Sequence, residues 1–97
     1  QWFNDTLILT RTSVITPWQV GNAGEVSRSS LAPALEQAPQ ILLIGTGATY
    51  AMCDTTLISQ LALDGIGVEF MDTAAACRTF NVLVHEQRSV VAALCLG

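Results

Sequence analysis

Lysine is absent from this sequence of 97 residues, and its positive charge comes from four arginines set against eight acidic residues. A protein that binds the phosphate backbone of nucleic acid needs clustered positive charge to displace counterions. Four scattered arginines and a net charge of −4 do not provide such a cluster. The composition therefore argues against nucleic acid as a partner, and it disfavours an anionic membrane surface for the same reason.

Long apolar runs and cysteine motifs are also missing. The longest apolar stretches, such as residues 90–96, fall well short of the ~20 residues that a membrane-spanning helix needs. No secretory signal is visible, and a start at Gln1 rather than Met indicates a trimmed or processed chain. Cys53, Cys77 and Cys95 are widely spaced without a CxxC motif, which argues against a disulfide framework and structural zinc. We expect buried, reduced thiols in an intracellular protein without a metal or membrane insertion.

What the sequence does have is apolar content. Hydrophobic residues make up 51% of the chain and charged residues only 12%, the opposite of a disordered composition. A domain of this length buries about 60–70% of its unfolded surface, so it depends on a dense core. We predict a single domain over residues 1–97.

The second half of the chain alternates between strand and helix patterns. Ile41 to Gly45 is a continuous apolar run, which is typical of a strand covered on both faces. The elements expected after it are a helix that Asp54 caps and Gly65 ends, a strand over residues 67–71, a helix over 73–87 that Asp72 or Thr73 caps, and a strand over 89–95. This alternation predicts an α/β sheet with right-handed crossovers.

The first half is harder to interpret. Residues 6–10 and 13–16 are short β-type runs, and Arg11 and Thr12 between them lack the Asn-Gly chemistry of a tight hairpin. A hairpin and a single bent strand therefore remain alternatives. Ser30 is predicted to cap a short helix over residues 31–37, whose first turn tolerates a proline.

The longest predicted helix separates the residues that resemble catalytic groups. At 100° per residue, Cys77 lies with the apolar side chains, whereas His85 lies on another face with Arg78. A nucleophilic Cys–His pair within this helix is therefore excluded. We interpret Cys77 as a packing residue and His85 as a charge that stabilises the helix C-terminus, since one histidine cannot form a metal site.

Glu69 is a carboxylate inside an otherwise apolar strand, so it must be either paired or solvent-facing. Arg78, in the following helix, is the nearest partner along the sequence. We predict a structural Glu69–Arg78 ion pair that ties strand to helix. If the pair is buried, removing one partner costs about 3–5 kcal/mol.

A candidate crevice lies at the carboxyl ends of the two strands that we expect to be parallel, where open α/β sheets bind ligands. The residues assigned to it are Gly45, Thr46, Gly47, Asp72, Thr73 and Arg78. The Gly-x-Gly spacing only partly matches a dinucleotide-binding turn, because Tyr50 replaces the third glycine. Both helix N-termini carry their own acids, which argues against a bound phosphate. Tight turns and helix caps are the leading explanation, and no cofactor is predicted.

Two segments, ILLIGTG (residues 41–47) and GIGVEFMDTAAACRTFNVLVHEQRSVVAALC (65–95), resemble domain-of-unknown-function family 498, the Mth938-like group, which includes a mitochondrial complex I assembly factor. Pro17-Trp18 also resembles the early tryptophan of that family, while Phe80 stands where tyrosine is common. The resemblance implies a three-layer α/β fold with a mixed, mainly parallel sheet, one antiparallel strand and flanking helices. Residues before Gln1 would then complete the first strand. Asp72, Thr73 and Arg78 carry over as the motif's signature, without an established enzymatic activity.

Two functions follow from these observations. The first is a non-catalytic protein-binding or assembly module, for which Trp2 and Trp18 would be natural contact anchors. The alternative is a small-molecule or nucleotide-binding protein, or an enzyme, that uses the crevice. The sequence favours the first because it shows no nucleophile–base pair and no metal cluster. We expect a cytoplasmic location in a bacterium and a mitochondrial one in a eukaryote.

Overall fold

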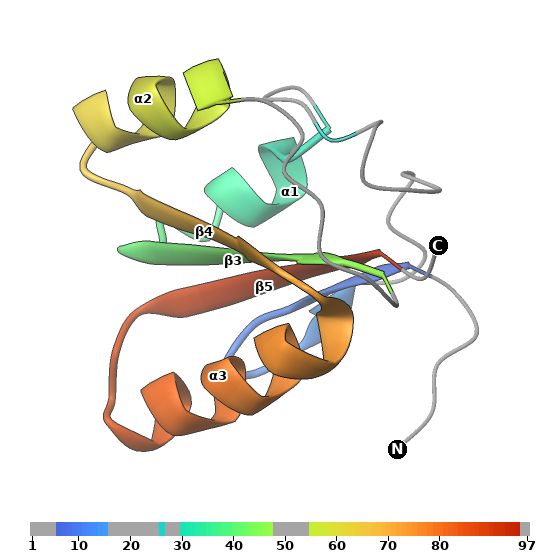
Figure 1. Ribbon diagram of the computed structural model, residues 1–97. Helices are drawn as coiled ribbons and strands as arrows, with labels where there is room; N and C mark the ends of the chain where they lie inside the picture. The colour runs from blue at the N-terminus through green and yellow to red at the C-terminus, as the bar shows by residue number, and fades with distance from the viewer. Residues whose placement is uncertain (1–5, 16–25, 27–29, 48–54, 96–97) are drawn as a thin grey trace.

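The computed structural model describes residues 6–15, 26, 30–47 and 55–95. The elements in chain order are β1 (Leu7–Leu9), β2 (Val14–Ile15), α1 (Ala32–Leu35), β3 (Ile41–Thr46), α2 (Thr55–Leu63), β4 (Gly67–Met71), α3 (Thr73–His85) and β5 (Val90–Cys95). They form three layers, with α1 and α2 on one face of the sheet and α3 on the other (Figure 1). The expected α/β architecture is confirmed.

The sheet is mixed, with the strand order β2-β1-β5-β3-β4. β3 runs parallel to both of its neighbours, β4 and β5, whereas β1 is antiparallel to β5 and to β2. Among the described strands, β1 alone therefore runs against the others. This is the mainly parallel sheet with one antiparallel strand that the family resemblance implies.

The position of β3 inside the sheet, between β5 and β4, explains its sequence. Leu42, Leu43 and Ile44 are at most 1% exposed, because helices cover both faces of the strand. A strand buried on both sides needs apolar residues at consecutive positions rather than at alternate ones. β5, the strand at the centre of the sheet, is buried along its whole length for the same reason. The predicted buried strand is confirmed and extends one residue further, to Thr46.

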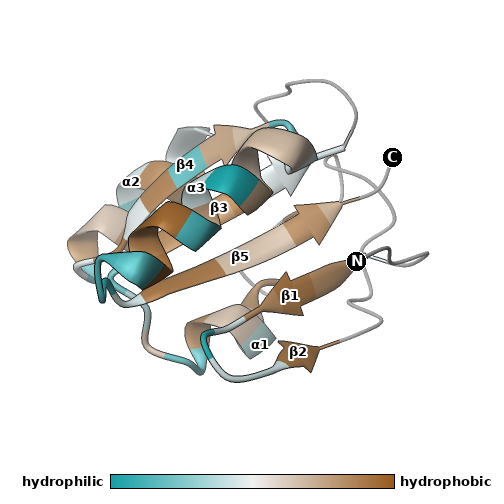
Figure 2. Cartoon of the chain, turned by 90° about the horizontal axis from the view of Figure 1, so that it is seen from below, coloured by the Kyte–Doolittle hydropathy of each residue, from teal (hydrophilic) through white to brown (hydrophobic). Residues whose placement is uncertain are grey.

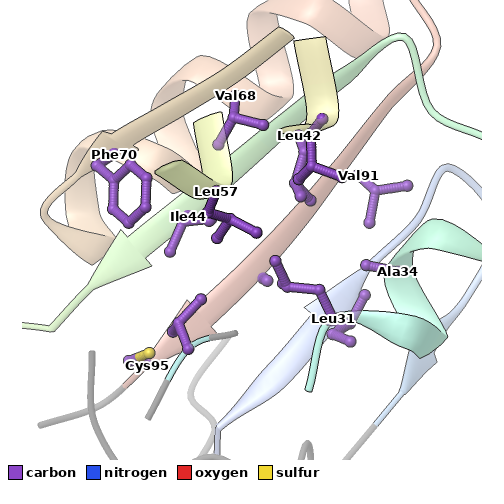
Figure 3. Close-up of a cluster of buried hydrophobic side chains, with 13 residues drawn as sticks. Leu31, Ala34, Leu42, Ile44, Leu57, Val68, Phe70, Val91 and Cys95 are labelled. Carbon is purple, nitrogen blue, oxygen red and sulfur yellow. The ribbon is translucent and has the colours of Figure 1, made fainter. Parts of the chain in front are cut away.

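Two hydrophobic cores lie on opposite faces of the sheet. The upper core fills the space between the sheet and helices α1 and α2, and Figure 3 shows its side chains converging from both layers. Its labelled members are Leu31, Ala34, Leu42, Ile44, Leu57, Val68, Phe70, Val91 and Cys95. The lower core packs α3 against the sheet through Ala76 and Phe80. Replacing a fully packed side chain such as Phe80 by alanine would cost about 3–5 kcal/mol.

Helix α3 follows the predicted wheel. Ala76 and Phe80 are buried, and Cys77, Leu83 and Val84 pack against the same core. The choice of N-cap is also settled, because the Asp72 Oδ1 atom accepts a hydrogen bond from the Ala75 backbone N–H at 2.8 Å. Thr73 is instead the first helical residue, which leaves its hydroxyl available for other contacts.

Two expectations for the first half of the chain, the β1–β2 connection and the N-cap of α1, can be compared with the structure. β1 and β2 form a hairpin rather than one bent strand, and residues 10–13 make the turn. In place of Asn-Gly, the Thr10 hydroxyl accepts hydrogen bonds from the Ser13 and Thr12 backbone N–H groups at 3.0 and 3.3 Å. The predicted Ser30 cap is wrong, since α1 begins one residue later and its N-cap position is Leu31.

Helix α2 matches the prediction at its C-terminal end. It stops at Leu63, and Gly65 adopts a positive φ of 82°, a backbone conformation that favours glycine after a helix. Asp54, the predicted cap of this helix, lies outside the described residues. So do Trp2, Pro17, Trp18 and Cys53.

Candidate functional site

The candidate crevice residues at the end of β3 and at the start of α3 come together as predicted. The Thr73 backbone N–H donates to the Gly47 carbonyl oxygen, and the Gly47 N–H donates to Thr73 Oγ1, both at 2.9 Å. The same Thr73 hydroxyl donates to the Cys95 carbonyl oxygen at 2.6 Å. One side chain therefore joins β3, α3 and β5, and we call Gly47, Thr73 and Cys95 the Thr73 junction.

The neighbouring polar groups at this edge are engaged in the same way. The Thr46 hydroxyl donates to the Met71 carbonyl oxygen at 3.2 Å, which ties β3 to β4. The Asp72 carboxylate caps α3. Each of these groups stabilises the meeting of strands and helix, so the geometry agrees with the interpretation of the motif as turns and caps.

The two glycines serve the close approach of α3 to the sheet. A Cβ atom on Gly45 would lie 2.9 Å from Leu94 Cδ2, 2.9 Å from Thr73 Oγ1 and 3.0 Å from Thr73 Cα. Real Cβ atoms essentially never make contacts below 3.0 Å, and 3.0 Å to a backbone atom is already tighter than most, so a side chain at position 45 would have to displace Thr73 or Leu94. Gly47 has a φ of 101°, in the left-handed region that side chains disfavour.

Arg78, the sixth residue assigned to the crevice, is not part of this arrangement. It lies exposed on α3, more than a turn beyond the Thr73 junction. The structure thus brings five of the six candidate residues together and leaves the guanidinium group at the surface.

The predicted ion pair between Glu69 and Arg78 is not seen between these two described residues. Glu69 alternates with the buried residues Val68 and Phe70, so it points to the face that α3 covers, yet it sits on β4 at the border of the described sheet and is exposed. Arg78 is exposed as well, and no ion pair joins the two in the part of the chain that the structure describes. The expectation of a buried pair is therefore wrong, and the solvent-facing alternative describes Glu69.

Cys77 and His85 occupy the positions expected of structural residues. Cys77 is a free, half-buried thiol, and burial raises its pKa, while the neighbouring Arg78 charge acts in the lowering direction. A raised pKa keeps the thiol protonated near neutral pH, which makes it a weak nucleophile. His85 is exposed at the end of α3. Among the described residues, no group of three or more His, Cys, Asp or Glu side chains could hold a metal ion.

A pocket at the opposite end of the sheet was not predicted. Its volume is about 140 Å³, and it is lined by Thr10, Arg11 and Thr12 of the β1–β2 turn, Gln37 after α1, and Ser89, Val90 and Val91 at the start of β5. These three segments are far apart in the sequence. No local motif signals the pocket, so only the topology of the sheet could have revealed it. We call it the amino-end pocket.

Helix α3 also carries an open hollow on its outer side. It is lined by Asn81, Val82, His85 and Glu86, and Val82 is 56% exposed there. A single helix provides all of these residues.

No helix in the described part of the chain has the length and apolar character needed to cross a membrane.

Comparison with known sequences gives one family. Residues 1–95 match the family described as "Protein of unknown function (DUF498/DUF598)". The 13 kDa major membrane protein of Francisella tularensis subsp. holarctica is 36% identical, over 91% of this chain and 72% of its own length. The NADH dehydrogenase (ubiquinone) 1 alpha subcomplex assembly factor 3 of Xenopus tropicalis is 38% identical over 82% of this chain. The chain spans only 45% of that assembly factor.

Solved structures share the fold. A crystal structure of a Bordetella parapertussis protein is 34% identical with a TM-score of 0.88, over 98% of this chain and 81% of the other. A Mth938-like domain from Bordetella pertussis, solved by NMR, is 31% identical with a TM-score of 0.71, over 96% of this chain and 74% of the other. The resemblance noted in the sequence is confirmed: this chain belongs to the DUF498/DUF598 family, alongside complex I assembly factor 3 and Mth938-like domains.

Proposed function

We propose that this protein is a non-catalytic protein-binding module that acts in the assembly of larger complexes. The observation that carries the proposal is its similarity to NADH dehydrogenase (ubiquinone) 1 alpha subcomplex assembly factor 3 over 82% of the chain. An assembly role requires that the protein bind at least one protein partner. We further propose an intracellular location, which fractionation of the source cells would test.

The geometry of the motif residues supports this proposal. At the edge where α/β sheets usually bind ligands, the hydroxyls of Thr46 and Thr73 and the carboxylate of Asp72 are hydrogen-bonded within the protein. A ligand that used these three side chains would compete with bonds that hold strands and helix together. We therefore propose that Thr46, Asp72 and Thr73 stabilise the fold and that a protein partner binds elsewhere on the surface.

The alternative is a small-molecule or nucleotide-binding protein, or an enzyme, that uses Gly45, Thr46, Gly47, Asp72 and Thr73. It has less support because Thr73 and Leu94 fill the space next to Gly45. A thermal-shift screen with NAD, FAD, ATP and CoA separates the two functions. A ligand at a hundredfold its dissociation constant should stabilise the protein by about 2.7 kcal/mol. We expect no shift with any of the four.

Site-specific photo-cross-linking tests the binding function directly. A benzophenone side chain would replace Val14 on the hairpin, Leu63 at the end of α2 or Val82 on α3, three exposed apolar residues on different elements. We expect one position, rather than all three, to capture a defined protein from extract of the source cells. Binding of that protein, once purified, should be saturable. Equal background capture at all three positions, together with a thermal shift by one of the nucleotides, would favour the alternative.

A further inference from the structure

We propose that the amino-end pocket receives an acidic side chain, aspartate or glutamate, of the protein partner. The inference depends on the proposed protein-binding function and specifies the chemistry of the partner. It starts from the construction of the pocket, in which three separate segments meet where β5 begins and β1 ends. Figure 2 shows the polar turn between β1 and β2 at this end of the sheet, beside otherwise apolar strands.

The β1–β2 turn, which contributes Arg11 to the pocket, is held in place by hydrogen bonds. The Thr10 N–H donates to the Ser13 carbonyl oxygen at 2.9 Å, and the Ser13 N–H donates back to Thr10 Oγ1 at 3.0 Å. These bonds close the turn and fix the backbone of Arg11 at its tip. A pre-ordered backbone loses less conformational entropy when a partner binds.

The start of β5, another part of the pocket lining, is equally well fixed. Val90 and Val91 are each 3% exposed and belong to the two cores. The Ser89 carbonyl oxygen accepts hydrogen bonds from the N–H groups of Gln40 and Ile41 at 2.9 and 3.0 Å, which anchors the start of β5 to β3. The start of β5, which contributes to the pocket lining, is therefore held firmly in the sheet.

The charge of the pocket determines the sign of its occupant. Among the described residues that line it, Arg11 is the only charged one, and Gln37, Ser89 and Thr12 add neutral hydrogen-bonding groups. Glu36 precedes Gln37 in the sequence but does not line the pocket. Guanidinium pairs with carboxylate through two parallel hydrogen bonds, the strongest common side-chain pairing. An acidic group is the complement of this arrangement.

The size of the pocket determines the kind of occupant. Ligand sites for cofactors and drug-sized molecules measure about 300–1,000 Å³. A pocket of about 140 Å³ is too small for a nucleotide and suits a single side chain.

Solution NMR tests the pocket without knowledge of the partner. The ¹⁵N-labelled protein is titrated with N-acetylglutamic acid amide at constant ionic strength, and N-acetylglutamine amide serves as the uncharged control. We expect saturable shifts confined to the backbone amides of Thr12, Gln37, Ser89 and their neighbours, with the acidic probe only. Arg11→Gln should abolish them, while Arg88→Gln, which removes the same charge at an exposed residue outside the pocket lining, should leave them in place.

The partner captured by cross-linking provides the second measurement. Arg11→Gln should weaken its binding about 10-fold, equivalent to 1.4 kcal/mol, whereas Arg88→Gln should change the dissociation constant by less than twofold. Arg11→Lys keeps the charge but cannot form the two parallel hydrogen bonds of a guanidinium group, so we expect an intermediate loss of binding affinity. A partner that binds Arg11→Gln as tightly as the original protein would overturn the pocket proposal and leave the binding function intact. No saturable shift with the acidic probe, or the same shifts with the uncharged control, would overturn the pocket proposal as well. Failure of cross-linking to capture any protein would instead count against the binding function.

Discussion

The two ends of the sheet differ in what their polar side chains bind. At the carboxyl end, Thr73 bonds to Gly47 and Cys95, so the polar groups are satisfied by the protein itself. At the amino end, Arg11 and Gln37 line a hollow of about 140 Å³ instead. Among the described residues, the polar groups of the sequence motif are hydrogen-bonded within the protein, whereas the end without a motif carries a pocket.

This contrast favours a structural role for the polar motif next to the glycines. Gly45 allows α3 to approach the sheet, and Thr73 then locks the helix to two strands. Residues with such a role are as restricted in type as catalytic residues, because few side chains fit the geometry. If the contrast is correct, substitutions at the carboxyl end will change stability, and those at the amino end will change binding.

Gly45→Ala should have the largest effect on stability. Its new Cβ atom would press against the backbone and hydroxyl of Thr73, which cannot move without breaking the junction. Overpacking of this kind costs about 1–3 kcal/mol, and we expect the upper part of this range. Urea unfolding measures the loss. Gly67→Ala is the matched control, because its Cβ would meet only the Gln40 carbonyl oxygen at 3.8 Å. Equal loss in both variants would contradict the close approach.

Thr73→Val tests the junction itself. Valine has nearly the same shape but leaves the Gly47 N–H and the Cys95 carbonyl oxygen without the partner they have now. An unsatisfied buried group costs about 1–3 kcal/mol, so we expect a loss of about 2 kcal/mol in chemical denaturation. Thr73→Ser keeps the hydroxyl and should lose less than half as much. A valine variant as stable as the serine variant would mean that the hydroxyl is dispensable.

Asp72→Ala should have a smaller effect. It removes the carboxylate that accepts a hydrogen bond from the Ala75 N–H at the start of α3. Loss of an N-cap residue costs about 1 kcal/mol, which thermal unfolding monitored by circular dichroism can detect. Asp72→Asn retains a capping oxygen and is expected to lie close to the original protein. Equal destabilisation by asparagine would point to the charge rather than to the hydrogen bond.

Arg11→Gln should leave stability within about 0.5 kcal/mol of the original value, since exposed substitutions away from caps and cores rarely do more. The same urea titration used for the carboxyl-end variants provides this comparison. The Arg11→Gln substitution should change only the binding of the partner. A loss as large as that of Thr73→Val would place Arg11 among the residues that hold the fold, and the contrast between the two ends would disappear.

The smallest effect is expected for the energetic coupling between Glu69 and Arg78. Both side chains are exposed, and exposed pairs contribute about 0.2–1 kcal/mol at most. In a double-mutant cycle of Glu69→Gln and Arg78→Leu, we expect a coupling energy below about 0.5 kcal/mol. A coupling of several kcal/mol would restore the strut that the sequence suggested.

The sequence predicted the elements whose burial leaves a clear periodicity. Ile41 to Ile44 reads as a buried strand because apolar residues occupy consecutive positions, and α3 reads as a helix because Ala76, Phe80, Leu83 and Val84 share one face. The convergence of Gly45–Gly47 with Asp72 and Thr73 was also predictable, since parallel strands end at the same edge.

The sequence could not predict what depends on the path of the chain between distant segments. Whether Glu69 is buried depends on the position of β4 at the border of the described sheet, which no local pattern encodes. The amino-end pocket depends on the meeting of Arg11, Gln37 and Ser89, which needs the order β1-β5-β3. Arg11 in isolation is only a turn residue without hairpin chemistry.

The place of β5 between β1 and β3 has a consequence for the synthesis of the chain. Leu7 pairs with Leu94, so the β1–β2 hairpin cannot join the sheet until β5, the last described strand, has been translated. At about 5–20 residues per second, the ribosome takes roughly 4–17 s to cover that interval. For that time, Leu7 and Ile8, which are almost fully buried in the finished protein, lack their neighbour. A nascent chain halted before residue 90 should therefore recruit chaperones more strongly than one released after residue 95.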